Sequence, residues 1–342
     1  MKTLTILAIV LSIGIKAYAQ DEHSSQFYAI PSKINPAFTG FFNNDYFVAA
    51  SYRTQWNTVT VPYQTVGASM EMSLIKNKHP NSFVGVGIEI MHDQAGTTNF
   101  QTNQISLNLS YLQVLDVERN HIIGIGFQNG MMMKSFDFSK ATFGNQFNGY
   151  DGFNQGMSPN ENGLNTKQID YNVGIGGVYS YAPAAHKNLY AGFSAFNITR
   201  PNISFYDGTE IRQNVRYVAT VGGEVELKNG WSLLPSALFQ SQGNNREIVF
   251  GTFAKYSLMR NRKERLAFNV GAWYRVKDAI IPAIKLEYKN INVTANFDIN
   301  VSKLTKVSKA IGSAEISISY SGNLFKEHVK PNKPVHCPSF IF

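Results

Sequence analysis

The residues that could carry catalysis or bind a metal ion are scattered along this 342-residue chain, and its seven histidines do not cluster. A nucleophile needs an adjacent base held by a third group, and no Gly-x-Ser-x-Gly turn supplies one. Glu224 and Glu226 share one face of an expected strand, but such charges usually pair across strands. The single cysteine, Cys337, follows His336, and two ligands are too few for a metal site. We therefore expect a non-enzymatic protein that has neither a cofactor nor a metal ion.

The elements that would position these side chains are strands, because apolar and polar residues alternate with a period of two. Ile105, Leu107, Leu109 and Tyr111 alternate with polar residues, and residues 291–300 repeat the pattern. Successive side chains of a strand point to opposite faces, so each segment has one apolar and one polar face. Charged residues make up only 16% of the chain and aromatic residues 13%, which also favours strands. Repeated along the chain, this alternation is typical of a transmembrane β-barrel.

About fourteen such segments predict a single-domain, all-antiparallel outer-membrane barrel over residues 45–321, since bacterial barrels have an even number of strands. Most segments are long enough for the roughly 9–11 residues of a tilted membrane strand. The expected strands are 45–54, 64–75, 82–92, 101–115, 119–132, 167–181, 188–197, 214–227, 231–240, 246–257, 264–276, 279–289, 291–301 and 313–321.

An export signal precedes the barrel. Lys2, an apolar core over residues 4–15 and the small-x-small sequence Ala17-Tyr18-Ala19 predict a signal peptide over residues 1–19. Residues 20–44 are rich in Phe, Tyr and Pro, and we expect them to plug or brace the lumen. Glycines on the inward face of some strands, such as Gly85 and Gly126, would make room for a plug, a ligand or side chains.

The connections between the strands alternate in length. Short turns at 117–118, 228–230 and 289–290 alternate with longer loops, of which 133–166 is the longest. Because such barrels place short turns in the periplasm and long loops outside, both termini are expected in the periplasm, residues 322–342 as a tail. Basic residues gather on that side, where they could bind anionic lipid headgroups or an acidic periplasmic partner. The candidates are Arg260, Arg262, Lys263, Lys326, Lys330 and Lys333. Without a recognition module, they do not indicate nucleic-acid binding.

Several short sequence blocks stand in order along the mature chain, and their residues are Asn35, Pro36, Gly40, Arg53, Gln55, Trp56, Asp93, Gly96, Pro235, Ser236, Glu315, Cys337 and Pro338. Together these blocks resemble the PorP/SprF family, outer-membrane proteins of the type IX secretion and gliding machinery of Bacteroidetes. Taken alone, Asn35-Pro36 also suits a turn, Arg53 and Trp56 an interface girdle, and Pro235 a bulge or a strand start. Ser339 stands where the family has an arginine.

The resemblance implies an integral outer-membrane component of type IX secretion. Such a protein would anchor periplasmic machinery, or help to export and attach a cognate secreted protein such as an adhesin, in contact with outer-membrane lipids. The alternative is an outer-membrane channel or porin for small solutes, because a barrel of this size can hold a lumen.

Overall fold

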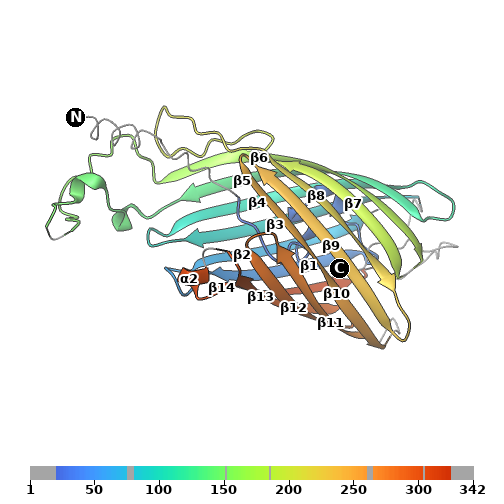
Figure 1. The fold of residues 1–342 in the computed structure, drawn as a ribbon. Coiled ribbons are helices and arrows are strands. Elements are labelled where there is room, and N and C mark those ends of the chain that lie inside the picture. The colour runs from blue at the N-terminus through green and yellow to red at the C-terminus, as the bar shows by residue number, and fades with distance from the viewer. Residues whose placement is uncertain are drawn as a thin grey trace, which may run out of the picture.

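The computed structural model describes residues 21–74, 81–150, 152–184, 186–259, 265–302 and 305–324. In these residues, fourteen strands form a closed barrel in which neighbours pair antiparallel and β1 pairs with β14 (Figure 1). The predicted fold class is confirmed. The strands are β1 (Tyr46–Gln55), β2 (Tyr63–Leu74), β3 (Ser82–Ala95), β4 (Phe100–Val114), β5 (His121–Ser135), β6 (Lys167–Ala184), β7 (Lys187–Phe196), β8 (Arg216–Glu226), β9 (Trp231–Gln242), β10 (Asn245–Met259), β11 (Leu266–Arg275), β12 (Ala279–Tyr288), β13 (Ile291–Asn300) and β14 (Ile311–Gly322).

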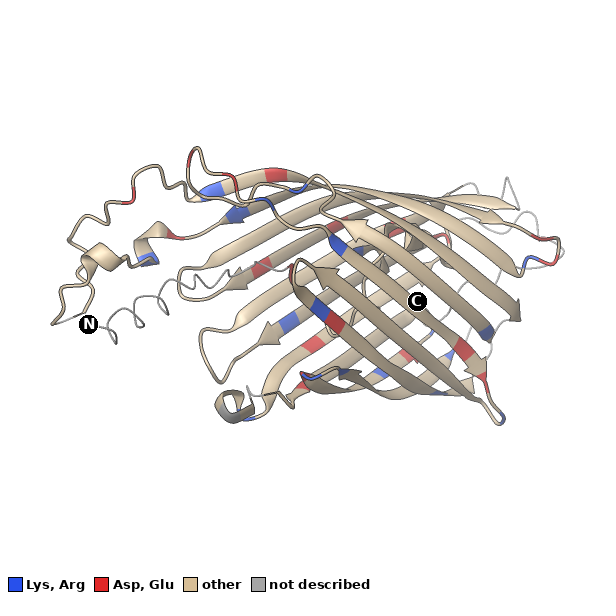
Figure 2. Ribbon diagram, turned by 45° about the horizontal axis from the view of Figure 1, so that its top comes forward, with Lys and Arg blue, Asp and Glu red and all other residues tan. Residues whose placement is uncertain are grey.

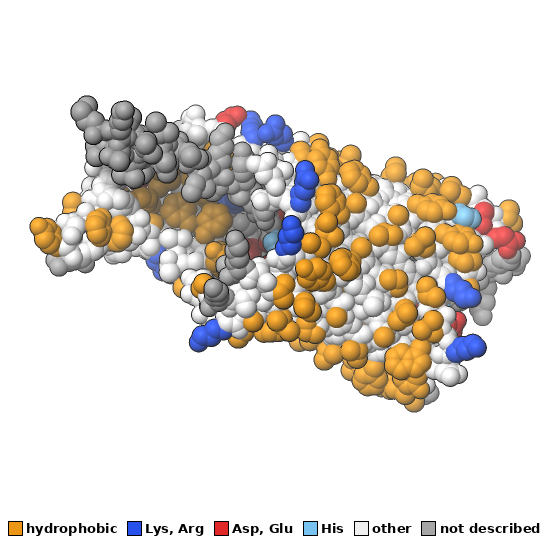
Figure 3. All heavy atoms as spheres, in the orientation of Figure 1, with side chains coloured by type: hydrophobic (Ala, Val, Ile, Leu, Met, Phe, Trp, Pro, Cys, Tyr) orange, Lys and Arg blue, Asp and Glu red, His pale blue; other side chains and the backbone are white. Residues whose placement is uncertain are grey.

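The wall of the barrel is apolar outside and polar inside, the reverse of a water-soluble core. On β4, Leu107 is 63% exposed, whereas its neighbours Ser106 and Asn108 are 1% and 3% exposed. Hydrophobic side chains spread over the outer face of the strands in Figure 3, and long stretches of strand carry no charged residue in Figure 2. Lipid covers the outer face, because the bilayer offers no hydrogen bonds to polar groups.

No helix in the described part of the chain is long and apolar enough to cross a membrane.

The expected strand boundaries lie within a few residues of the observed ones. The largest differences are at the carboxyl ends of β3, β5 and β6, which each continue three residues beyond the expected end. In β6 the extension follows a register shift between Tyr181 and Ala184 in its pairing with β7. An irregularity of this kind adds residues that a strict alternation cannot anticipate.

The two ends of the barrel differ. At the short-turn end, Asn229 and Gly230 join β8 to β9 with φ of 57° and 86°, as a tight hairpin turn requires. At the long-loop end, residues 136–150 and 152–166 project beyond the barrel (Figure 1) and contain the short helices η3 (Phe138–Lys140) and η4 (Gly144–Gln146). The helix α2 (Thr305–Ser308) lies in the loop before β14.

Residues 21–45 run through the barrel interior, and we call them the inner segment. At the long-loop end, the N–H of Asp21 donates to Oε1 of Gln242, the last residue of β9, at 2.9 Å. At the short-turn end, the N–H of Asp45 donates to the carbonyl of Gly322 at 2.9 Å. The helices η1 (Pro31–Lys33) and η2 (Pro36–Phe38) lie between. The sequence analysis expects both termini at the short-turn end. Asp21 instead lies at the long-loop end, where Gln242 binds it, so the expectation is wrong for this residue.

Candidate functional site: the inner segment and the outer mouth

A buried ion pair near the long-loop end holds the start of the inner segment. Arg53 on β1 and Glu315 on β14 stand opposite each other, with Nε and Oε1 3.0 Å apart and side chains 8% and 2% exposed. The Glu315 carboxylate accepts the N–H groups of Ser25 and Gln26 at 2.7 and 2.8 Å. Arg53 donates to the carbonyl of His23. The pair therefore fixes the main chain of the inner segment as well as linking the two strands that close the barrel.

A second charged pair, which reaches across β12 from β11 to β13, extends this contact. Arg275 on β11 donates from Nη1 to Oδ2 of Asp298 on β13 at 3.0 Å. The same oxygen accepts the hydroxyl of Ser25 at 2.7 Å, and the amide of Gln26 donates to Oδ1 of Asn296 at 2.6 Å. Buried charges persist only when they are paired and hydrogen-bonded. The inner segment therefore supplies hydrogen bonds that the charged lining needs.

Farther along, the inner segment lies directly against glycines of the wall. A Cβ atom at Gly126 would lie 2.2 Å from the backbone nitrogen of Ala37, and one at Gly176 would lie 2.1 Å from Oδ1 of Asn35. That Oδ1 accepts the N–H of Ala37 at 2.9 Å and so caps η2. Pro36 fills the first position of η2, where its missing N–H loses no hydrogen bond. These glycines form a recess that fits the Asn-Pro-Ala turn.

The turn that follows is held by side chains of two strands and lies against a glycine of the strand between them. Gly40 has a φ of 70°, and its N–H donates to Oε2 of Glu71 on β2 at 3.1 Å. The hydroxyl of Ser110 on β4 donates to the carbonyl of Thr39 at 2.6 Å. A Cβ atom at Gly85 on β3 would lie 2.0 Å from that carbonyl oxygen. The inner segment thus fits the wall closely from Asn35 to Gly40.

Aromatic rings fill the space on the opposite wall. The ring of Tyr28 lies 5.2 Å from that of Trp273, whose Nε1 donates to the hydroxyl of Ser236 at 3.1 Å. Pro235 faces outward inside β9, opposite Thr252, and the pairing with β10 continues across it without a register shift. The expectation of a bulge or a strand start at Pro235 is therefore wrong. The pairing of β9 with β8 has a gap at Pro235. The N–H that proline lacks therefore interrupts the hydrogen bonds to β8 and not those to β10.

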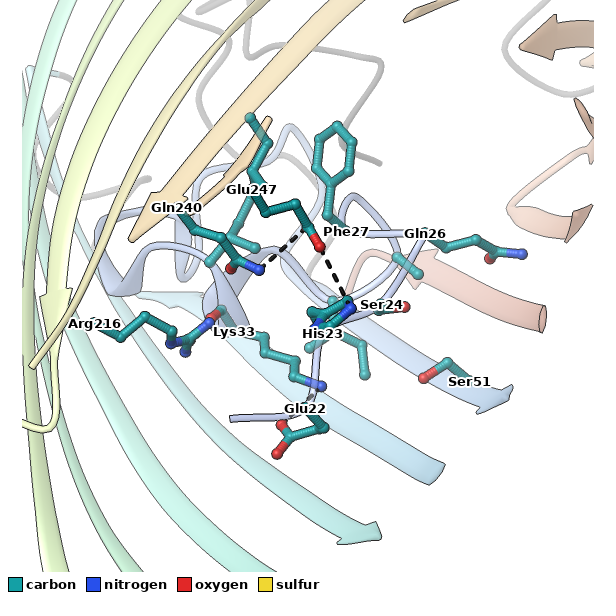
Figure 4. A pocket seen from close by; sticks show the side chains of 14 residues that line it. Glu22, His23, Ser24, Gln26, Phe27, Lys33, Ser51, Arg216, Gln240 and Glu247 are labelled. Atoms are coloured by element: carbon teal, nitrogen blue, oxygen red, sulfur yellow. Dashed lines mark hydrogen bonds and ion pairs between the residues drawn. The ribbon is translucent and has the colours of Figure 1, made fainter. Parts of the chain in front are cut away.

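A narrow pocket of about 30 Å³ separates the start of the inner segment from the wall (Figure 4). In this pocket, Nε2 of His23 lies 3.4 Å from Oε2 of Glu247. The other carboxylate oxygen of Glu247, Oε1, accepts a hydrogen bond from the side-chain amide of Gln240 at 3.2 Å. Burial, followed by the positive charges of Arg53 and Arg275, lowers the pKa of His23 well below its usual value. The docked inner segment therefore carries a neutral His23 at neutral pH.

A larger cavity of about 370 Å³ lies at the long-loop end, between the start of the inner segment and the wall, and we call it the mouth cavity. Arg53, Gln55, Trp56 and Asp93 all line it. The sequence analysis selected these four residues from separate blocks, and the barrel brings them together. Its other lining residues are Asp21, Glu22, His23, Tyr63, Thr65, Arg275, Asp278, Asp298, Asn300 and Gly312.

The remaining candidates lie elsewhere. Gly96 has a φ of 68° in the turn between β3 and β4, with space around it. The basic candidates and the carboxyl-terminal motif lie outside the described residues, namely Arg260, Arg262, Lys263, Lys326, Lys330, Lys333, Cys337 and Pro338. In the part of the chain that the structure describes, no group of three His, Cys, Asp or Glu residues is arranged to hold a metal ion.

Sequence reasoning missed the second charged pair and its partner in the inner segment. Asp298 was visible as the one acid in the polar row of β13, among neutral side chains such as Asn292 and Asn296. A lone acid on an inward face requires a partner. Nothing local indicated that the partners would be Arg275 and Ser25, because they come from distant parts of the chain.

Comparison with known families identifies the chain. The family model described as "Type IX secretion system membrane protein PorP/SprF" matches residues 16–320. The chain belongs to the PorP/SprF family. The family and the closed barrel together make it an integral outer-membrane protein with a role in type IX secretion. A comparison with curated proteins gave no match.

Solved structures are similar to this chain at low sequence identity, and the first of them shares its fold. The deltaS2S3 mutant of the monoaromatic hydrocarbon channel TodX is 11% identical, with 89% of this PorP/SprF chain and 95% of TodX covered and a TM-score of 0.51. A Pseudomonas aeruginosa FadL homologue is 9% identical, with 89% and 99% covered and a TM-score of 0.47. The Ralstonia pickettii toluene transporter TbuX is 10% identical, with 84% and 92% covered and a TM-score of 0.46.

Proposed function

We propose that this chain is a non-enzymatic anchor of the type IX secretion system that helps to attach a cognate secreted protein, such as an adhesin, to the cell surface. The observation that carries the proposal is the inner segment, which follows the lumen from the long-loop end to the short-turn end. Main-chain contacts to Glu315 and the glycine recess hold it along this path. A barrel filled in this way suits a fixed support better than a solute channel.

The surface contact is assigned to the long loop within residues 133–166. Its hairpin is ordered by the Phe147–Phe153 bridge and by the N–H of Asn154 donating to the carbonyl of Gln146 at 2.8 Å. Tyr150 at its tip is 95% exposed. Large aromatic side chains on an ordered exposed loop favour a protein contact. Deleting residues 141–160 should abolish surface display of the partner, and unchanged display would refute this assignment.

The periplasmic contact is assigned to the basic residues of the short-turn end, Arg260, Arg262 and Lys263, together with the tail lysines. Positive side chains at a rim steer an acidic partner, chiefly through the association rate. Charge reversal at the three turn residues should lower recovery of periplasmic machinery. Charge reversal at Lys277, an exposed residue of the long-loop end, is the matched control. Equal recovery of periplasmic machinery with both variants would contradict the assignment of the periplasmic contact to these residues.

The first test of the whole proposal is purification of the tagged protein from its native outer membrane in mild detergent, followed by mass spectrometry. Recovery of periplasmic machinery or of one large secreted protein is expected. Recovery of the barrel alone in several detergents would favour the alternative, a channel for small solutes.

Planar-bilayer conductance then separates the anchor from the channel. The wild-type barrel should be silent, because the inner segment fills the lumen. Steady single-channel currents from the wild-type protein would contradict the proposal.

A further inference from the structure

The mouth cavity gathers hydrogen-bonding groups that the protein leaves unused. In the described part of the chain, the amide of Gln55, the indole N–H of Trp56 and the hydroxyl of Tyr63 have no hydrogen-bond partner. The rings of Trp56 and Tyr63 lie 5.0 Å apart. A cavity of this size with aromatic rings and a few convergent polar groups is typical of a binding site.

The charges of the lining are unbalanced at one position. Of the five acids that line the mouth cavity, four have a basic side chain within 4.0 Å: Asp21 with Arg216, Glu22 with Lys33, and Asp278 and Asp298 with Arg275. The fifth, Asp93, accepts only the hydroxyl of Thr65, at 2.6 Å. Lys134 stands two strands away in the same inward row, beyond Thr102, but it makes no ion pair with Asp93. Among the described residues Asp93 therefore lacks a direct ion pair, and it can accept one from a bound cation.

Arg53 supplies an independent observation. It lines the mouth cavity, is only 6% exposed, and its Nη2 has no hydrogen-bond partner. A buried donor without an acceptor is costly, and each such group calls for an explanation. The cavity thus combines an unused acceptor at Asp93 with an unused donor at Arg53, and a ligand that fits it needs both a cation and an acceptor.

The same wall already binds extended polypeptide. Arg53 donates to the carbonyl of His23, and Glu315 accepts the N–H groups of Ser25 and Gln26. His23 and Arg53 also line the mouth cavity, so the cavity continues the groove in which the inner segment lies. A peptide carries carbonyl acceptors along its main chain and cations on its lysine and arginine side chains, which matches the unused groups.

We propose that the mouth cavity binds an extended polypeptide from the cell-surface side and that Asp93 receives a lysine or arginine side chain of it. Arg53 donates from Nη2 to a main-chain carbonyl of the bound polypeptide. Trp56 and Tyr63 pack against the aliphatic part of the basic side chain. This inference rests on the proposed attachment of a secreted protein, and it names where and through which chemistry a segment of that protein would be held.

The test uses the full-length protein in detergent micelles. The binding probes are pentalysine and pentaglutamate, each labelled with fluorescein, and the competitor is an unlabelled neutral oligosaccharide, maltopentaose. Pentalysine should bind in fluorescence anisotropy, although the protein has a formal net charge of +8 that favours pentaglutamate on global electrostatics. Asp93→Asn should weaken this binding about tenfold, which corresponds to about 1.4 kcal/mol. Binding should also change the tryptophan fluorescence of the wild type and not of Trp56→Phe.

The matched control is Glu210→Gln, which removes one negative charge from an exposed residue of another loop. It should leave pentalysine binding unchanged. Preference for pentaglutamate, displacement by maltopentaose, or equal effects of Asp93→Asn and Glu210→Gln would each overturn the proposal. If a secreted protein co-purifies while pentalysine does not bind, the anchor function stands and the cavity assignment fails. Heat-dependent gel migration verifies that each variant forms the barrel.

Discussion

The glycine recess predicts that one added methyl group on the inner wall will loosen the inner segment. In Gly126→Ala, the new Cβ would lie 2.2 Å from the backbone nitrogen of Ala37, whereas ordinary contact begins at 3.4 Å. The inner segment must therefore move by about 1.2 Å, the difference between these distances. Overpacking of this kind costs about 1–3 kcal/mol. At 1.4 kcal/mol per factor of ten, the population of the undocked segment should rise roughly 5- to 140-fold.

Gly177→Ala is the matched control, because Gly177 has only one neighbour, at 3.7 Å. Both substitutions reduce the entropy of the unfolded chain by the same amount, about 0.4–1 kcal/mol, so their difference isolates the contact with the inner segment. The assay is hydrogen exchange with mass spectrometry on residues 36–45 in micelles, since exchange reports local opening. Exchange should accelerate in Gly126→Ala and not in Gly177→Ala. Equal exchange in the two variants would refute the role of the recess.

Three further predictions concern the start of the inner segment. Glu315→Gln should destabilise the barrel by about 3–5 kcal/mol, because a buried guanidinium loses its counter-ion; an unchanged unfolding temperature in heat-dependent gel migration would contradict this. Docking lowers the pKa of His23 below its usual 6.5, so protonation favours the undocked state. Inner-segment exchange, corrected for intrinsic rates, should therefore accelerate as pH falls below about 6.5, and His23→Gln should remove that dependence. Glu22→Cys, in a Cys337→Ala background, should react with an impermeant maleimide on intact cells, whereas Lys289→Cys at the short-turn end should not; the reverse pattern would show that the orientation is inverted.

The sequence by itself determined the barrel and its family. The alternation of Ile105, Leu107 and Leu109 with polar neighbours is a local property, because a strand turns successive side chains to opposite faces wherever it lies. Turn residues such as Asn229-Gly230 are equally local. The strand number, the antiparallel order and the outer-membrane location follow from such signals. The blocks from Asn35 to Glu315 then predicted the PorP/SprF family, which the family model confirms.

Only the tertiary structure decided what the polar face does. Arg53 and Glu315 are 262 positions apart and meet because β1 pairs with β14 when the barrel closes. Ser25 reaches Glu315 because the inner segment runs from the long-loop end to the short-turn end, a direction that no pattern within residues 20–44 encodes. A period of two says which side chains point inward, but their partners depend on the strand register around the closed barrel and on the path of a segment with no repeating pattern. For that reason the mouth cavity, with Gln55, Trp56 and Asp93 together, is a property of the fold.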